Sequence, residues 1–180
     1  MNRKTFLLVV AAAVGIACLA VGLGFPPRPS VEYPARFAAD TSAAKRLESA
    51  LEGIEGAATS GDIARFREAL TARFLGELER QVQELGGRRI DAMWLHDAGS
   101  FLGDVHEFQF RGGIGSGARA WVVFSVGGGA LAGHELRAFE FDATDGQPRL
   151  DRKRSRRLQG SDDARSAAAE WLRELGTDWP

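Results

Sequence analysis

Residues 118–126 have the sequence ARAWVVFSV, and the four central residues, WVVF, are all apolar. Consecutive residues of a β-strand point to opposite faces of the sheet, so this segment predicts a central strand that is covered on both sides. Residues 127–129 are all glycine and predict a change of direction. Glu135–Asp142 (ELRAFEFD) then predicts another strand, with Phe139 and Phe141 on one face.

Further strands are expected on either side of these two. Asp145-Gly146 predicts a tight hairpin turn, because this pair accepts positive φ angles, and Gln147–Leu158 would be the returning strand. Upstream, the alternation in Val105–Arg111 predicts a strand, and Arg89–His96 predicts a further strand or an irregular edge. The glycine-rich segment Gly112–Gly117 predicts a loop between strands rather than a phosphate-binding loop, because no helix and no Lys-Ser/Thr pair follow it.

Two amphipathic helices are predicted before these strands. Phe37–Ala58 repeats apolar residues at three- and four-residue spacing. The next helix starts with Thr59 and Asp62 in a capping-box pattern and ends at Gly86, because glycine accepts the left-handed conformation that follows a helix. Its predicted apolar stripe consists of Ile63, Phe66, Leu70, Phe74, Leu78, Val82 and Leu85.

A C-terminal helix completes the predicted domain. Ser161 would be its N-cap, and Gly176 would follow its end. Its predicted buried face consists of Ala164, Ala168, Trp171, Leu172 and Leu175. The sequence therefore predicts an α+β fold, in which N-terminal helices pack on an antiparallel sheet of three to five strands and one helix follows the sheet.

This element order, together with a helix that opens with residues 60–66 (SGDIARF), resembles the NTF2-like (SnoaL-like, cone-shaped) superfamily. The resemblance covers Phe37–Leu158 and implies a curved sheet that wraps over the helices and leaves a pocket at its open end. No catalytic motif of the family can be carried over residue by residue. The C-terminal helix departs from the family pattern and would cover one face of the sheet or the pocket mouth. Bacterial envelope proteins of this superfamily combine a single anchor with an extracytoplasmic cone domain.

The N-terminus predicts a transmembrane helix or an export signal. Arg3 and Lys4 precede Thr5–Phe25, an uncharged segment of 21 residues, and about 20 apolar residues span the hydrocarbon core as a helix. Because the positive residues come first, the N-terminus is expected in the cytoplasm and the following chain outside it. Residues 26–36, with their prolines, predict a linker, and residues 37–180 are long enough for one domain.

Three interpretations of this segment stay open. An uncleaved signal-anchor would hold the chain in the bacterial inner membrane as a single-pass protein. A cleaved signal peptide, with a cut after Ala20 or Gly24, would leave the domain secreted or periplasmic. Acylation of Cys18 would make a lipoprotein, although the usual Leu three residues earlier is absent. Cys18 is the chain's only cysteine, so the domain has no disulfide and no Cys-based zinc site.

Charge is unevenly distributed along the domain. From Phe37 onward there are 19 basic and 23 acidic residues, a net charge of −4, whereas residues 149–157 alone carry +5. An acidic body with one basic stripe argues against general nucleic-acid binding. The stripe would bind anionic lipid headgroups, or an acidic envelope protein or cell-wall polymer, or its charge would protect an edge strand from aggregation. Its basic residues are Arg149, Arg152, Lys153, Arg154, Arg156 and Arg157.

His106 is the candidate residue for chemistry, because it would share a strand face with Phe108 and Phe110. It could serve as a general base or hydrogen-bonding group in an apolar pocket, or it could be a structural histidine at the sheet margin. The other candidates for the mouth of this pocket are Asp104, Trp94 and His96. Each histidine is followed by an acid, but neighbours in a strand face opposite ways, so no dyad is predicted, and the histidine spacing predicts no metal site.

Taken together, these patterns predict an anchored envelope protein whose extracytoplasmic domain has a binding or assembly role, without a cofactor. The alternative is a small pocket enzyme or ligand carrier of the NTF2-like type that uses His106 and nearby carboxylates. An open pocket on the order of a few hundred Å³, in which His106 and a carboxylate converge, would favour the alternative. A closed, apolar-filled cone would exclude it.

Overall fold

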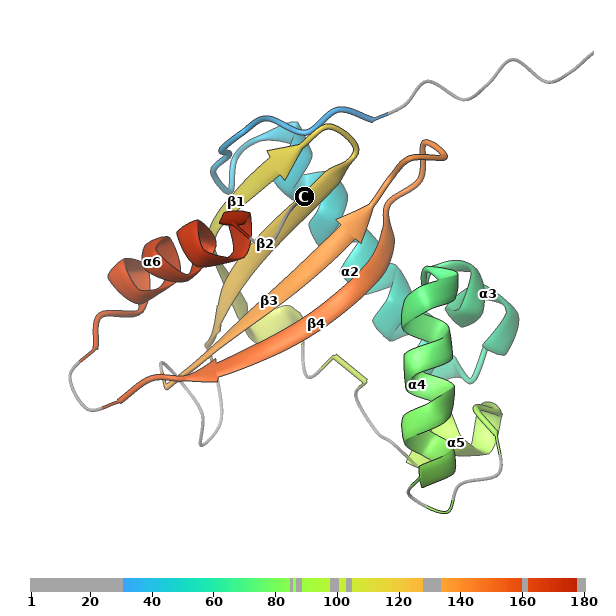
Figure 1. The fold of residues 1–180 in the computed structure, drawn as a ribbon. Helices are drawn as coiled ribbons and strands as arrows, with labels where there is room; N and C mark the ends of the chain where they lie inside the picture. Colours follow the sequence, from blue (N-terminus) through green and yellow to red (C-terminus); the bar gives the residue numbers. More distant parts are fainter. Residues whose placement is uncertain are drawn as a thin grey trace, which may run out of the picture.

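The computed structural model describes residues 31–84, 86, 89–97, 101–102, 105–127, 134–159 and 162–177. In chain order the elements are α2 (Ser42–Ser60), α3 (Ile63–Glu68), α4 (Ala72–Glu84), α5 (Ala92–Asp97), the 3-10 helix η1 (Val105–Glu107), β1 (Phe108–Ser116), β2 (Arg119–Val126), β3 (Glu135–Asp142), β4 (Arg149–Arg157) and α6 (Ala164–Thr177). The four strands form one open antiparallel sheet in the order β1-β2-β3-β4. The predicted α+β class is therefore confirmed, with helices before the sheet and one helix after it (Figure 1).

The sheet separates two apolar cores. One face packs against α2 and the other N-terminal helices through Val122, Phe139 and Phe141. The other face packs against α6 through Trp121 and Val123. Because β2 contributes buried side chains to both cores, the prediction of a strand covered on both sides is confirmed. Figure 1 shows α2 behind the sheet and α6 in front of β1 and β2, so that α6 does not extend over the front of β4.

Helix α2 begins later than its predicted start at Phe37. Thr41 is its N-cap, and the Thr41 side chain accepts a hydrogen bond from the Ala44 N–H at 3.2 Å. Phe37 instead pairs with β1: its N–H donates to the Gly113 carbonyl at 3.0 Å, and its carbonyl accepts from the Gly113 N–H at 3.1 Å. The backbone N–H and carbonyl of Phe37 therefore form hydrogen bonds with the edge strand of the sheet instead of with a longer helix.

The single helix predicted from Thr59 to Gly86 is wrong, because the chain forms two helices there. Thr59 lies inside α2, and Asp62 is the N-cap of α3, where its carboxylate accepts from the Arg65 N–H at 3.1 Å. Residues 69–71 then separate α3 from α4.

This break is caused by pairing with the sheet. The Thr71 N–H donates to the Leu150 carbonyl at 3.0 Å, and the Leu150 N–H donates to the Ala69 carbonyl at 2.9 Å. A contact with a strand so distant in sequence cannot be seen in local periodicity. The predicted apolar stripe is still confirmed at its buried members, which are Phe66, Leu70, Phe74, Leu78 and Val82.

The strand or irregular sheet edge predicted at Arg89–His96 is wrong, because residues Ala92–Asp97 form the helix α5. The Asp91 carboxylate accepts from the Trp94 N–H at 2.8 Å, which is the hydrogen bond of a helix N-cap. Leu95 of this short helix is fully buried.

The loop predicted at Gly112–Gly117 is also wrong. β1 continues to Ser116, and Gly117 is the residue of this segment with a positive φ, +58°. The strand begins at Phe108 rather than at Val105, because the three preceding residues form η1.

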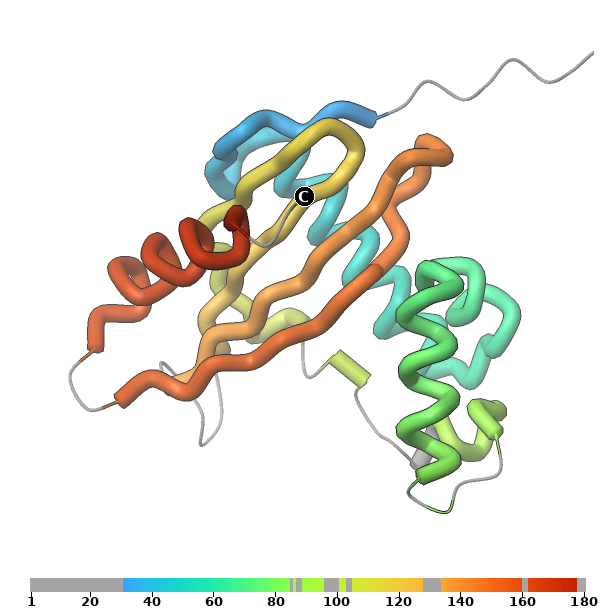
Figure 2. Tube along the Cα trace, in the orientation of Figure 1, coloured from blue at the N-terminus to red at the C-terminus, as the bar shows by residue number. Residues whose placement is uncertain are grey.

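The glycines of β1 allow the extended segment 33–37 to lie against the strand, as Figure 2 shows. A Cβ atom added to Gly113 would lie 2.2 Å from the Phe37 ring, and one on Gly115 would lie 2.5 Å from the Tyr33 Cβ. Any larger residue at either position would push this segment away from β1.

The second half of the sheet follows the prediction closely. β3 has the predicted bounds, and the chain turns back at the predicted place, but of the pair Asp145-Gly146 only Gly146 has a positive φ, +84°. β4 forms the returning strand within the predicted range. In α6, Ala168, Trp171, Leu172 and Leu175 are buried as predicted, but Gly176 lies inside the helix rather than beyond it. The predicted N-cap Ser161 lies outside the described residues.

The predicted membrane segment at residues 5–25 also lies outside the described residues. None of the helices in the described ranges has the length and apolar character needed to cross a bilayer. Of the predicted linker, residues 31–36 are described, and the Tyr33 N–H donates to the Gly117 carbonyl at 2.9 Å.

Candidate functional site

A row of arginines occupies the half of the sheet face that α6 leaves uncovered. Arg154 lies opposite Ala138 and Arg156 lies opposite Leu136, and both partners belong to the core under α6. Cross-strand partners share a face, and alternation along β4 places Arg152 on the same side. We call the following guanidinium-bearing residues the arginine face: Arg73, Arg119, Arg149, Arg152, Arg154 and Arg156.

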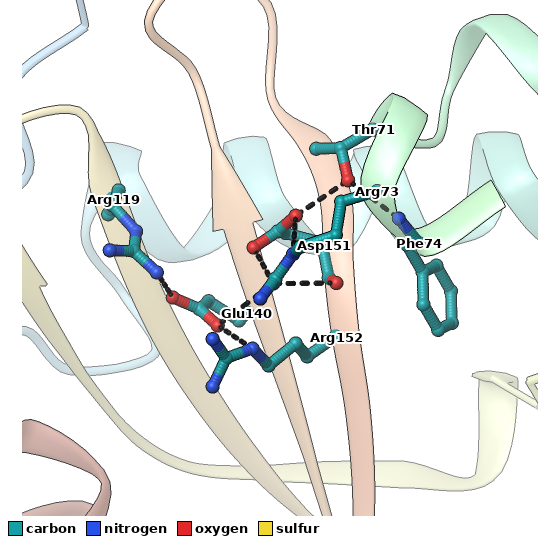
Figure 3. A network of polar contacts seen from close by, with 7 residues as sticks. All are labelled: Thr71, Arg73, Phe74, Arg119, Glu140, Asp151 and Arg152. Atoms are coloured by element: carbon teal, nitrogen blue, oxygen red, sulfur yellow. Dashed lines mark hydrogen bonds and ion pairs between the residues drawn. The ribbon is translucent and has the colours of Figure 1, made fainter. Parts of the chain in front are cut away.

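A buried carboxylate lies at the centre of the arginine face (Figure 3). The Glu140 side chain is 1% exposed, and Arg119 donates to its Oε1. The Arg152 Nε lies 3.2 Å and the Arg73 Nη2 3.9 Å from the Glu140 Oε2. A buried carboxylate needs such compensation to remain charged, so the three guanidinium groups and Glu140 fix one another's positions.

A second carboxylate ties the arginine face to α4. The register between β3 and β4 shifts at Asp151, which forms a β-bulge. The Asp151 Oδ1 accepts from the Thr71 hydroxyl at 2.6 Å and from the Arg73 Nε at 3.1 Å, and the Arg73 Nη2 donates to the Asp151 Oδ2. The Thr71 hydroxyl also accepts from the Phe74 N–H at 3.2 Å, so the residue that caps α4 also binds β4.

Two buried tryptophans support the outer arginines. The Arg154 guanidinium carbon lies 5.5 Å from the ring centroid of Trp121, and that of Arg156 lies 4.9 Å from the Trp171 ring. Both distances fall within the range of cation–π contacts. Arg156 also forms an ion pair with Glu174 of α6, so this helix borders the arginine face.

Burial separates the opposite charges of this site. The side chains of Arg119, Arg152 and Arg73 are 30%, 32% and 40% exposed, whereas those of Glu140 and Asp151 are 1% and 9% exposed. The negative charges therefore lie beneath the positive ones, and the outer surface presents guanidinium N–H donors. The planar fork of Arg matches the oxygens of phosphate and carboxylate groups, so the arrangement can bind an oxyanion.

Two members of the predicted basic stripe point to the other face of the sheet. Lys153 lies opposite Phe139, and its Nζ donates to the Phe101 carbonyl at 2.9 Å and lies 4.6 Å from the Phe101 ring centroid. Burial lowers the pKa of Lys153, and the positive charge of Arg137 lowers it further. Arg157 lies opposite Glu135 on this same side and is exposed.

Arg149 lies at the start of β4, beside the hairpin turn. Its Nη2 is 2.6 Å from the Asp145 Oδ2, and Arg149 lies opposite Asp142 on β3. The stripe predicted from the sequence is therefore not one surface, because strand alternation divides it between the two faces of the sheet.

His106 lies in η1 rather than in a strand, so the predicted strand face that it would share with Phe108 is wrong. The two residues nevertheless line one pocket of about 270 Å³, together with Glu48 and Glu52 of α2. Burial raises the pKa of Glu48, and the negative charge of Glu52 raises it further. The pocket thus combines a histidine with two carboxylates. The sequence analysis named His106 but not Glu48 or Glu52.

The other predicted pocket residues are placed differently. Trp94 is partly buried against the helix-side core and does not line the pocket of His106. Asp104 and the side chain of His96 lie outside the described residues. Among the residues with described positions, no three His, Cys, Asp or Glu side chains are grouped closely enough to hold a metal ion.

Sequence reasoning missed two members of the arginine face, Arg73 and Arg119, and the two carboxylates beneath it, Glu140 and Asp151. One signal was available: Glu140 interrupts the apolar sequence AFEF of β3, and a charged residue inside a buried strand requires charged partners.

Comparison with protein-family models, with curated proteins and with solved structures finds no match to this chain.

Proposed function

We propose that this chain is a membrane-anchored envelope protein whose extracytoplasmic domain binds anionic lipid headgroups through the arginine face. The observation that carries this proposal is the burial of Glu140 beneath three partly exposed guanidinium groups. The anchor is the segment predicted at residues 5–25. Membership of the NTF2-like superfamily is part of the proposal and is supported only by the coarse element order, in which N-terminal helices precede one antiparallel sheet.

The charge distribution favours a membrane as the partner. From Phe37 onward the chain carries a net charge of −4, so most of the domain would be repelled by an anionic surface. Basic residues near such a surface are attracted by about 1 kcal/mol each. The domain would therefore turn the arginine face toward the bilayer and its acidic helices away from it.

The proposed anchor also keeps the domain near the bilayer. Five residues, 26–30, separate the predicted span from Val31, and a fully extended chain of that length reaches at most about 18 Å. Hydrogen bonds from Tyr33 and Phe37 then hold the following segment on the edge of β1. Such a short connection favours headgroups of the same membrane over a distant acidic protein as the partner.

Vesicle sedimentation tests this proposal. A fragment beginning at residue 31, with its folding checked by circular dichroism, should bind phosphatidylglycerol vesicles but not neutral phosphatidylcholine vesicles. Changing Arg152, Arg154 and Arg156 to Ala should weaken this binding by roughly 100-fold, because three attractions of about 1 kcal/mol are lost.

The matched control changes three exposed arginines of α3 and α4, Arg65, Arg67 and Arg80, to Ala. It removes the same charge and should retain most of the binding. If both triple variants bind equally well, or if the unchanged fragment does not bind anionic vesicles, lipid docking by the arginine face is wrong. An acidic protein would then be the partner to consider.

The pocket lined by His106, Glu48 and Glu52 supports a second candidate function, a small pocket enzyme or ligand carrier. A thermal-shift screen with small-molecule metabolites tests it. A compound that stabilises the wild type but not the His106→Gln variant would favour this function, with His134→Gln as the matched control. If no compound stabilises the chain, or if stabilisation survives His106→Gln, this candidate is excluded.

A further inference from the structure

A groove of about 470 Å³ lies at the opposite edge of the sheet from β4. Residues 35–37 form one wall, residues 112–116 of β1 form the floor, and α6 forms the other wall. Its volume falls in the range of about 300–1,000 Å³ that is usual for small-molecule sites. None of its lining residues belongs to the arginine face or to the pocket of His106.

Glycines shape both the floor of the groove and its α6 wall. A Cβ atom on Gly112 would lie 2.8 Å from the Leu172 Cδ1, and one on Gly176 would lie 3.1 Å from the Ile114 Cδ1. The absence of these side chains brings α6 close to β1 and leaves an open channel beside them. Ile114, Leu172 and Phe37 contribute apolar side chains to its lining.

Two exposed arginines line the groove, and their environment differs from that of the arginine face. Arg36 lies on the N-terminal segment and Arg173 on α6. In the part of the chain that the structure describes, neither guanidinium group contacts a carboxylate, whereas Glu140 and Asp151 compensate the arginines above them. An apolar channel with two uncompensated positive charges is complementary to a ligand that has an apolar chain and an anionic end.

We propose that this groove binds a single-chain anionic amphiphile. The acyl chain lies over the glycine floor between Ile114 and Leu172, and the anionic head group contacts Arg36 and Arg173. The wall residue Ala35 is only ten residues beyond the end of the predicted span, so a membrane would supply such a ligand. That source depends on the proposed anchor, but binding at the groove does not depend on lipid docking by the arginine face.

Photo-crosslinking of the full chain in phosphatidylcholine nanodiscs tests this inference. The probe is palmitate that carries a diazirine on its acyl chain, and labelled peptides are identified by mass spectrometry. We expect labelling concentrated on the peptides that contain Ile114 and Leu172. The variant Ala169→Trp fills the groove from an exposed position of α6 and should abolish this labelling.

Charge variants test the proposed head-group contacts. Arg36→Gln and Arg173→Gln should each weaken probe binding roughly tenfold, as expected for one lost charge-assisted hydrogen bond. A diazirine-bearing fatty alcohol of equal length should be unaffected by either change. Arg165→Gln is the matched control, because Arg165 is an exposed arginine of α6 that does not line the groove.

Competition identifies which amphiphile is preferred. Displacement of the probe by unlabelled palmitate would support a fatty acid as the ligand, and displacement by lysophosphatidylglycerol would support a lipid with a phosphate head group. Labelling that neither compound displaces would overturn the proposal. Labelling that is spread evenly over the chain, or that persists in Ala169→Trp, would overturn it as well, whether or not the arginine face binds vesicles.

Discussion

Glu140 lies directly opposite Trp121 on the neighbouring strand, and both side chains are buried on the α6 side of the sheet. Trp121 belongs to the apolar core that α6 covers, whereas Glu140 contacts Arg119, Arg152 and Arg73 of the arginine face. This pair therefore marks the boundary between the covered and the uncovered halves of the face. The position of α6 decides which half can bind a partner.

Replacing the buried carboxylate should destabilise the fold strongly. Glu140→Gln keeps the size of the side chain but leaves the neighbouring guanidinium groups without their buried counter-charge. We expect a loss of about 3–5 kcal/mol in the free energy of unfolding, measured by urea denaturation. The control Glu79→Gln removes an ion pair with Arg67 in which both side chains are more than 40% exposed. Its free energy of unfolding should therefore fall by about 1 kcal/mol or less. Equal losses would contradict a structural role for Glu140.

The sequence predicts those elements whose signals are local. β2 and β3 are recognised because consecutive apolar residues and strict alternation are visible within nine residues. The break at residues 69–71 is not, because it depends on hydrogen bonds to Leu150, about 80 positions later. The glycines of β1 suggest a loop until their contacts with Tyr33 and Phe37 are known. In both places a tertiary contact overrides the local preference.

The candidate site shows the same limit. The basic residues of β4 are evident in the sequence, but their division between two faces depends on strand alternation and on the bulge at Asp151. Arg73 and Arg119 come from other elements, and only the folded register brings them to Glu140. The sequence therefore reveals that positive charge is concentrated, but not which guanidinium groups act together.

Thr71 should contribute to stability through two bonds at once. Thr71→Ala removes the N-cap of α4 and the hydrogen bond to Asp151, so we expect a loss of about 2 kcal/mol in thermal or urea denaturation. Thr71→Ser keeps the hydroxyl and should lose much less. If the Ser variant is as unstable as the Ala variant, the methyl group rather than these hydrogen bonds would be responsible.

Gly113 should not tolerate a side chain. In Gly113→Ala the new Cβ would overlap the Phe37 ring, so we expect a loss of about 1–3 kcal/mol and faster proteolysis within residues 31–41. Gly76 provides the control, because nothing lies within 4 Å of a Cβ added there, inside α4. Gly76→Ala should stabilise the chain by up to about 1 kcal/mol, since Ala is the better helix former. Unchanged proteolysis in Gly113→Ala would argue against close packing of the segment on β1.

The packing of Tyr33 against β1 should make stability sensitive to alkaline pH. The Tyr33 side chain is buried, and its pKa is raised from 10.0 to about 12, mainly by burial; the positive charge of Arg46 opposes this rise and the negative charge of Asp142 adds to it. Tyr33 is the only tyrosine of the chain, so the absorbance of the phenolate reports its titration alone. We expect this absorbance to rise near pH 12 in the folded chain. A midpoint near pH 10 without unfolding would contradict the burial of Tyr33.

The free energy of unfolding should fall at alkaline pH, because the folded chain holds the Tyr33 proton more tightly than the unfolded chain does. Between pH 10 and pH 12 the unfolded chain has lost the Tyr33 proton while the folded chain retains it, so stability is retained below pH 10 and falls as the pH rises toward 12. The loss amounts to roughly 2–3 kcal/mol at most. Tyr33→Phe has no proton to lose, so its free energy of unfolding should fall less over the same interval. The Tyr33 hydroxyl is buried without a hydrogen-bond partner among the described residues, so Tyr33→Phe should cost little stability at pH 7. Parallel decreases in the two proteins above pH 10 would assign the alkaline sensitivity to another group.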